Sequence, residues 1–307
     1  LTFVALLLCI FEFINSKVTY NFRMKYVSSL LLVLICTLTF GQQTTQKPKN
    51  IILLIGDGMG LSEISSSLYF NDKPSNFLRF NTVGLSVTSS SKELITDSAA
   101  GATAFASGIK TYNGAIGVDR NMMPVETIVE HISKKEIATG VIATSSVVHA
   151  TPAAFYAHQE SRRMYEEIAA DLTNSEIDFF AGGGLRFFNR RTDSLDLLEQ
   201  LRLNNFEVHT EALPKKISAK KQAILLADDG MPKMSENRGN FLTNATMLAI
   251  GQLSKNKEGF FLMVEGSQID WGGHDNDAEY LVNEMIDFDK TIGAVLDFAR
   301  SEENTSE

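Results

Sequence analysis

The sequence predicts an α/β fold built on a mainly parallel sheet. Short apolar runs rich in β-branched and aromatic residues alternate with longer segments of helical periodicity. Strands that alternate with helices in this way pair in parallel, because each helix carries the chain back across the sheet. Polar residues of the types used in catalysis and metal binding follow several of the apolar runs. With 307 residues and 44% hydrophobic content, the chain can form a substantial core.

Four segments have the composition of buried parallel strands: residues 50–55, 139–144, 177–181 and 260–264. The predicted helices are residues 98–107, 124–135, 161–173, 193–204, 240–254 and 278–300. Ligands bind beyond the carboxyl ends of strands in open α/β sheets, so functional side chains should follow the strand segments. Suitable side chains do so at residue 57, at residues 144–151 and at residues 265–274.

The N-terminal part of the chain has the pattern of a leader. Met24 opens a segment with a basic residue, an apolar run at residues 30–38 and small residues at positions 39 and 41. This pattern predicts a signal peptide, residues 24–41, and a periplasmic or secreted protein. The apolar run is shorter than the roughly 20 residues of a transmembrane helix, so we expect no stable membrane anchor after cleavage. The alternative is an anchor formed by residues 1–40.

Residues 1–23 precede the first Met, and we expect them to be upstream sequence or an extended leader. Residues 42–49 form a polar lead-in to the first strand. Both cysteines, Cys9 and Cys36, lie in the leader, so the mature chain should contain neither disulfides nor a thiolate metal site.

The first motif is Asp57, which follows the first strand between two glycines. A carboxylate there can approach a metal without obstruction, and its oxygens suit both Zn²⁺ and Mg²⁺. The alternative is an Asp-Gly turn that starts the next helix.

The second motif is Asp97-Ser98, followed by a run of small residues that favours a helix. Ser98 would lie at a helix N-terminus, where free N–H groups and the helix dipole attract a phosphate. A serine becomes a good nucleophile only when a base or a metal activates it. The alternative is a serine that merely caps a closely packed helix.

The third motif runs from His149 through Thr151-Pro152 to Arg162. Thr151 offers a hard oxygen that suits Mg²⁺. Arg162 can hold a phosphate in a bidentate manner. The alternative is a turn with Arg162 on a solvated helix face.

The fourth motif, residues 264–274, is the most specific. Glu265 ends a buried strand, and Asp270 and His274 follow it four residues apart. That spacing places both side chains on one side of a helical turn, within reach of one ion. The alternative is a polar loop with a hydrogen-bonded histidine.

The net charge of −9 argues against a nucleic-acid-binding surface, which would show a basic footprint. An acidic protein that binds phosphate has to supply positive charge locally, and bound metal ions are one way to do so.

In this order, the four motifs resemble those of alkaline phosphatases, and the likeness covers residues 48–298. It implies a three-layer sandwich with a central mainly parallel sheet flanked by helices. It also implies two Zn²⁺ and one Mg²⁺, and hydrolysis of small phosphate monoesters through a phosphoserine. A homodimer is the assembly common among such proteins. The alternatives are a phosphodiesterase or phosphomutase of the same superfamily, or a non-catalytic metal- or phosphate-binding fragment.

The resemblance implies three catalytic roles. Ser98 would be the nucleophile, Arg162 would hold the substrate phosphate, and Asp97 would orient Arg162. Trp271 would lie beside the phosphate site.

The resemblance also implies a set of metal ligands. The first zinc would take Asp57 and Ser98, the magnesium would take Asp57, Thr151 and Glu265, and the second zinc would take Asp270 and His274. His149 would bear on the magnesium site and could favour zinc or another ion there.

The sequence departs from the family pattern near its end. The resemblance implies a later Asp-His pair and a further His, and the chain has no Asp-His pair. We therefore expect a truncated chain, in which residues 50–300 are the N-terminal part of the catalytic domain and residues 301–307 are a tail. It should bind zinc poorly and hydrolyse little, because only the magnesium set is complete. The other histidines, at 131, 158 and 209, are expected to be structural or exposed.

Overall fold

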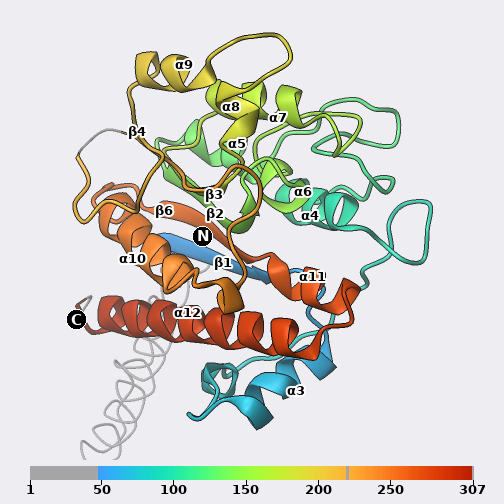
Figure 1. Cartoon of the computed structure of the whole chain (residues 1–307), viewed down its shortest axis with the longest axis vertical. Helices are drawn as coiled ribbons and strands as arrows, with labels where there is room; N and C mark the ends of the chain where they lie inside the picture. Colours follow the sequence, from blue (N-terminus) through green and yellow to red (C-terminus); the bar gives the residue numbers. More distant parts are fainter. Residues whose placement is uncertain (1–47, 219–220, 306–307) are drawn as a thin grey trace, which may run out of the picture. The chain divides into compact units, whose positions relative to one another are not determined.

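The computed structural model describes residues 48–218 and 221–305. The predicted α/β fold is confirmed, because six strands form one sheet in the order β1-β6-β2-β3-β5-β4 and every neighbouring pair is parallel (Figure 1). The strands are β1 (Asn50–Gly56), β2 (Ala138–Ser146), β3 (Phe179–Gly183), β4 (Phe206–His209), β5 (Lys221–Leu225) and β6 (Phe260–Gly266).

Helices cover both faces of this sheet. They are α3 (Leu61–Phe70), α4 (Ser98–Ser107), α5 (Ile128–Ser133), α6 (Ala150–Ala153), α7 (Tyr165–Thr173), α8 (Arg186–Asn189), α9 (Leu197–Leu203), α10 (Phe241–Leu253), α11 (Gln268–His274) and α12 (Ala278–Thr305), with 3₁₀ turns η1 (Asn76–Arg79) and η2 (Met234–Glu236). In Figure 1, α10 and α12 lie on one side of the sheet and α5 and α7 to α9 on the other. The described residues from Lys49 onward therefore form three layers.

Two apolar cores lie between the layers, one on each face of the sheet. Successive side chains of a strand point to opposite faces, so neighbouring residues enter different cores. In β2, Val141 packs in the core under α7 and α9, whereas Ile142 packs in the core under α10 and α12. Met263 and Val264 of β6 divide in the same way. All four side chains are fully buried, as expected for inner strands of a parallel sheet.

The helices predicted from the sequence occur where they were expected, but several of them begin or end at other residues. Helix 98–107 is confirmed without change. The predicted helix 124–135 shortens to α5, because Thr127 caps it in a capping box with Glu130. The predicted helix 161–173 begins only at Tyr165, so Arg162 lies in the turn before α7, where its N–H donates to Gly114 O at 2.7 Å.

Two predictions about strands need correction. The segment 50–55 is not fully buried, because β1 is an edge strand of the described sheet and Ile51 is 49% exposed. The edge strand β4 and its neighbour β5 were not predicted, since β4 has only four residues with charged and polar members, and β5 begins with Lys221-Gln222. His209, predicted from the sequence to be structural or exposed, is the last residue of β4.

Several predictions fall outside the described residues. These are the upstream segment 1–23, the signal peptide 24–41, both cysteines and most of the lead-in 42–49. In the part of the chain that is described, no helix has the length and apolar character required to span a bilayer.

The topology brings the motifs together. Strand β6 lies between β1 and β2, with Ile55 and Ala143 both in register with Glu265. The carboxyl ends of these three strands therefore meet at one edge of the sheet, where they carry Asp57, Glu265 and the residues that lead to His149.

Candidate active site

Ser98 is the first residue of α4. Asp97 caps this helix, since its Oδ1 accepts from the Ala100 N–H at 2.9 Å. The small residues that follow, such as Ala99, are buried and let α4 pack closely on its neighbours. The Ser98 hydroxyl donates to Asp57 Oδ2 at 3.1 Å. The helix start therefore presents a serine oxygen beside a carboxylate and next to free backbone N–H groups.

Asp57 lies in the turn that follows β1, where its N–H donates to Gly266 O at 3.3 Å. Gly58 has φ +67°, and a Cβ there would lie 2.7 Å from Asp270 Oδ1, so only glycine lets this turn approach Asp270. Burial and then the Asp270 charge raise the pKa of Asp57 to about 6, against the opposing effects of Ser98 and Arg162. Two carboxylates that repel each other in a partly buried turn favour the binding of a cation.

Glu265 is buried at the end of β6. Burial and then the Asp57 charge raise the pKa of Glu265 to about 8, although the side chains of Ser267, Thr151 and Ser145 lower it. In the described structure its Oε1 is buried and has no hydrogen-bond partner. Thr151, in α6, is buried as well. Glu265 therefore lies near Asp57 and Thr151, and its Oε1 can still accept a bond from a donor or a cation.

Arg162 faces Asp97 and His149. Its Nη1 donates to Asp97 Oδ2 at 3.1 Å, and its Nη2 lies 3.4 Å from His149 Nε2. Burial and then the Arg162 charge lower the pKa of His149 to about 4, so this ring is neutral at pH 7. The ring also meets Trp271 edge to face, with centroids 5.8 Å apart. Asp97 and His149 therefore fix the orientation of the Arg162 guanidinium, and they use only part of its five N–H donors.

Asp270 and His274 lie one turn apart in α11, as the spacing predicted. The His274 Nε2 is 3.4 Å from Asp270 Oδ2, and the His274 side chain is 78% exposed. A cavity of about 400 Å³ opens beside this site and is lined by His149, Tyr165, Met231, Lys233, Gln268 and Trp271. The nine predicted site residues lie in the turn after β1, at the end of β6, and in or shortly before α4, α6, α7 and α11.

Other predicted side chains lie elsewhere. His158 contacts Gly117 O at 2.7 Å and Glu130 Oε1 at 2.9 Å, beside a separate cavity of about 280 Å³. His131 is exposed and pairs with a glutamate, and His209 contacts Gln222. These three histidines are structural or exposed, as expected.

Two serines beside Glu265 have no role assigned from the sequence. Ser267 Oγ donates to Glu265 Oε2 at 2.5 Å, and Ser145 Oγ lies 3.5 Å from the same oxygen. Both lie in the segments 144–151 and 265–274 that follow strands, but residue type alone did not mark either serine for a role.

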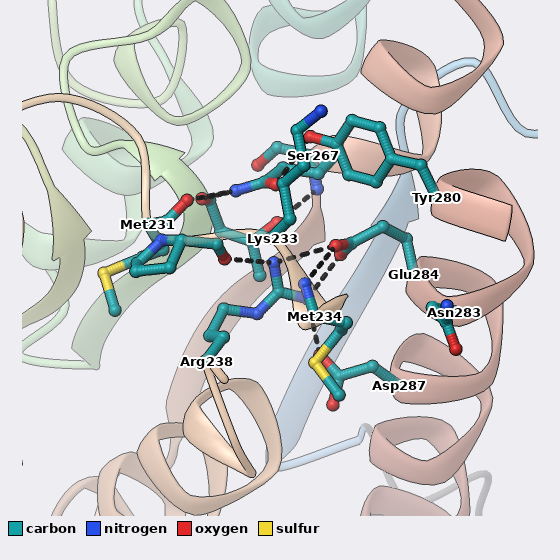
Figure 2. A network of polar contacts seen from close by, with 12 residues as sticks. Met231, Lys233, Met234, Arg238, Ser267, Tyr280, Asn283, Glu284 and Asp287 are labelled. Atoms are coloured by element: carbon teal, nitrogen blue, oxygen red, sulfur yellow. Dashed lines mark hydrogen bonds and ion pairs between the residues drawn. The ribbon is translucent and has the colours of Figure 1, made fainter. Parts of the chain in front are cut away.

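A buried charge cluster between α12 and the loop around η2 was also missed. Figure 2 shows Arg238 between Glu284 and Asp287 of α12, with the loop residues Met231 to Met234 beside them. Arg238 binds both carboxylates and also donates to Pro232 O at 3.1 Å. Burial raises the pKa of both carboxyl groups, and Arg238 lowers it. No sequence motif marks this cluster, because Arg238 lies 46 residues from Glu284.

The donor atoms fit a hard cation better than a tetrahedral zinc site. Among the described residues, no group of three or more His, Cys, Asp and Glu side chains is placed to hold a metal ion. Asp57, Glu265 and Thr151 combine two carboxylates with a hydroxyl, which is a donor set for Mg²⁺. Each expected zinc position has two predicted ligands from the described residues, Asp57 and Ser98 or Asp270 and His274, where a tetrahedral site takes four.

Known proteins resemble this chain over most of its length. The family model described as alkaline phosphatase matches residues 48–306. Alkaline phosphatase 3 of Bacillus subtilis is 39% identical over 84% of this chain and 59% of its own length, and alkaline phosphatase 4 is 38% identical over 86% and 61%. The chain thus spans about three fifths of the length of these two relatives.

Solved structures show the same relationship. The alkaline phosphatase from the Antarctic bacterium TAB5 is 53% identical, with a TM-score of 0.83 over 84% of this chain and 76% of that chain. A single-residue variant of the TAB5 protein, 54% identical with a TM-score of 0.82, has Mg bound in a site called M3; the match covers 84% of this chain and 75% of that chain.

Proposed function

Because the chain belongs to the alkaline phosphatase family, we propose that its Ser98 site hydrolyses small phosphate monoesters to an alcohol and inorganic phosphate. One observation carries the proposal. Ser98 Oγ, at the N-terminus of α4, lies 3.1 Å from Asp57 Oδ2, and Asp97, the residue before it, holds the Arg162 guanidinium. A nucleophile, a group that orients it and a phosphate-binding cation thus converge from three parts of the chain.

Ser98 forms the covalent intermediate in this proposal. Its Oγ bonds to phosphorus while the ester bond to the alcohol oxygen breaks, and the serine proton ends on the departing alcohol. Water then cleaves the phosphoserine, which releases inorganic phosphate and restores the hydroxyl. Asp57 Oδ2 accepts the hydroxyl proton in a hydrogen bond and so fixes the direction of Oγ before the attack.

Arg162 holds the phosphoryl oxygens. Its guanidinium keeps the donors that Asp97 does not use, and Asp97 fixes its plane. Charge develops on the equatorial oxygens during phosphoryl transfer, and a cation positioned in advance stabilises them. The N–H groups at the start of α4 act on the same charge.

Metal ions belong to the proposal as cofactors. Asp57, Thr151 and Glu265 would hold Mg²⁺, with His149 beside them. Asp57 and Ser98 would contribute to a first zinc, and Asp270 and His274 to a second. Bound there, such ions would activate the nucleophile and stabilise the attacking and leaving oxygens of an in-line displacement. The residues of this chain fit the magnesium set best, so we propose that Mg²⁺ binds readily and zinc weakly.

The test is a pair of assays on purified protein in Mg²⁺ and Zn²⁺. Release of p-nitrophenol from p-nitrophenyl phosphate should exceed release from its bis-ester, and mass spectrometry of acid-quenched samples should find phosphate on Ser98. A faster reaction with the bis-ester would support the phosphodiesterase alternative. Phosphate found on a different residue would refute the assigned nucleophile.

A non-catalytic metal- or phosphate-binding role is the second candidate. It is favoured by the small number of protein ligands at each zinc position. Calorimetry with Mg²⁺, Zn²⁺ and inorganic phosphate, beside the same assays, separates the two: binding without turnover supports the second candidate.

Export and self-association complete the proposal. The pattern at residues 24–41 supports a periplasmic or secreted location, and cell fractionation tests it. A homodimer, proposed from the family, is tested by light scattering of the purified protein.

A further inference from the structure

Glu265 is held through one of its two oxygens. Ser267 Oγ lies 2.5 Å from Oε2, and Ser145 Oγ lies 3.5 Å from the same atom. The other oxygen, Oε1, is buried without a hydrogen-bond partner in the described structure. A buried carboxylate oxygen without a donor is unfavourable, so this asymmetry marks the side from which a cation would bind.

The Ser267 hydroxyl has its direction fixed. Its oxygen accepts from the Ser145 N–H at 3.0 Å, so its own proton is directed to Glu265. The Ser267 N–H donates to Thr144 Oγ1 at 2.9 Å. These bonds join the carboxyl end of β2 to the carboxyl end of β6, and all the atoms involved are buried.

The Ser267 hydroxyl does not cap α11, although Ser267 occupies the N-cap position. Ser267 directly precedes α11, where a serine commonly accepts a hydrogen bond from an N–H group of the first turn and stabilises the helix by about 1 kcal/mol. Here Ser267 makes no such side-chain bond. Its hydroxyl donates to Glu265 instead.

We propose that Ser267 is a positioning residue, which turns Glu265 so that Oε1 faces the divalent cation held with Asp57 and Thr151. Ser145 lies farther from this oxygen, and its hydroxyl donates to Ser146 O at 3.1 Å. This inference rests on the magnesium set of the proposed function. Groups that hydrogen-bond a ligating carboxylate fix its orientation, and their loss typically lowers metal affinity about 10- to 100-fold.

The test compares Ser267→Ala with Ser67→Ala in the full chain. Ser67 is a matched control, because its hydroxyl is also buried but bonds to Ile64 O and Ser75 in another part of the fold. The dissociation constant for Mg²⁺ is measured by calorimetry, and thermal unfolding is measured in EDTA. Ser267→Ala should raise the Mg²⁺ Kd about 10-fold or more, and Ser67→Ala should leave it unchanged.

The outcomes distinguish failure of the Ser267 positioning role from failure of the proposed magnesium site. If wild type binds Mg²⁺ and Ser267→Ala binds it equally well, the positioning role is wrong, even if that variant unfolds at a lower temperature. If wild type binds no Mg²⁺, the magnesium set itself is refuted. Ser267→Cys gives an independent test should Ser267→Ala not fold: its thiol is a weak donor to Glu265, so the Mg²⁺ Kd should rise, and unchanged binding in Ser267→Cys would then overturn the proposal.

Discussion

The Ser98 hydroxyl donates a hydrogen bond to Asp57 Oδ2 at 3.1 Å, although 41 positions separate the two residues in the chain. The bond joins the start of α4 to the end of β1. Neither residue alone distinguishes a catalytic site from an ordinary helix cap and an ordinary turn. Their contact supports the proposed catalytic role, because it places a serine oxygen beside a carboxylate with a raised pKa.

Ser98→Ala should abolish phosphoserine formation and lower p-nitrophenyl phosphate turnover about 10³-fold or more, because it removes the nucleophile. The matched control is Ser107→Ala at the other end of α4, whose hydroxyl bonds to Thr103 O at 2.7 Å. Turnover and phosphate incorporation are measured together. Equal turnover in Ser98→Ala and wild type would contradict the nucleophile assignment.

Arg162→Ala should weaken inhibition by inorganic phosphate about 10-fold or more, since a charge-assisted hydrogen bond contributes roughly 1.5–3 kcal/mol. Arg163→Ala is the control, because Arg163 is the next residue and is exposed. Phosphate inhibition constants are compared at constant ionic strength. An equal effect of the two substitutions would reduce the role of Arg162 to general surface charge.

Asp57→Asn should abolish the stabilisation by bound Mg²⁺ without lowering the stability of the metal-free protein. Magnesium at about 100 times its Kd should stabilise wild type by about 2.7 kcal/mol, and this gain should disappear in the variant. In EDTA the variant should be at least as stable as wild type, because the repulsion between Asp57 and Glu265 is gone.

Thermal unfolding with and without Mg²⁺ measures both effects. The exposed Asp72→Asn serves as the control for the loss of one negative charge. An Asp57→Asn protein that keeps its magnesium stabilisation would show that the cation binds elsewhere.

Arg238→Met should destabilise the fold by about 3–5 kcal/mol, because it leaves Glu284 and Asp287 buried without their cation. The control is Arg202→Met, which breaks an exposed pair with Glu199 and should change stability by less than about 1 kcal/mol. Denaturant unfolding gives both values. A loss below 1 kcal/mol for Arg238→Met would show that the cluster relaxes or hydrates.

The contribution of His158 to stability should depend on pH. Burial alone would lower the pKa of His158, but the Gly117 carbonyl and Glu130 outweigh it and raise this pKa above 6.5. A raised histidine pKa stabilises the fold fully below 6.5, and this contribution is lost as the pH rises through the folded-state value. Burial alone would raise the pKa of Glu130, but the Thr127 N–H and His158 hold it below 4.5, so its contribution is lost as the pH falls through that lower value.

The pair should therefore stabilise most between about pH 4.5 and 6.5. His158→Gln should cause a larger loss of stability near pH 6 than near pH 9, and Glu130→Gln should show the same trend. Denaturant unfolding at the two pH values provides the measurement. A loss that does not change with pH would mean that the imidazole is neutral throughout.

Much of the fold was predictable because strand and helix periodicity are local. Helix 98–107 and the inner strands β2 and β6 came from apolar patterning alone. Strand β4 was not predictable, since its four residues depend on pairing with β5 for their conformation. Thr127 and Asp196 cap their helices later than the apolar pattern suggested, so these ends followed side-chain hydrogen bonds.

The candidate site divides in the same way. Residue type and position after a strand made Asp57 and Glu265 candidates without a structure, and residue type alone made Arg162 one. The hydrogen bonds that orient them could not be predicted, because each joins residues far apart in the chain. Ser267 shows this most clearly: its position favours a helix cap, and only the packing of β2 beside β6 gives its hydroxyl another partner.

The sequence by itself determined the α/β class, the order of the motifs and the candidate residues for the proposed chemistry, because these depend on local composition and spacing. The tertiary structure alone decided that Ser98 bonds to Asp57, that Arg162 is fixed by Asp97, and that Glu265 keeps one oxygen without a partner. The physical reason is that hydrogen bonds and charge interactions depend on distance and burial. Both are set when β1, β6 and β2 align in the sheet.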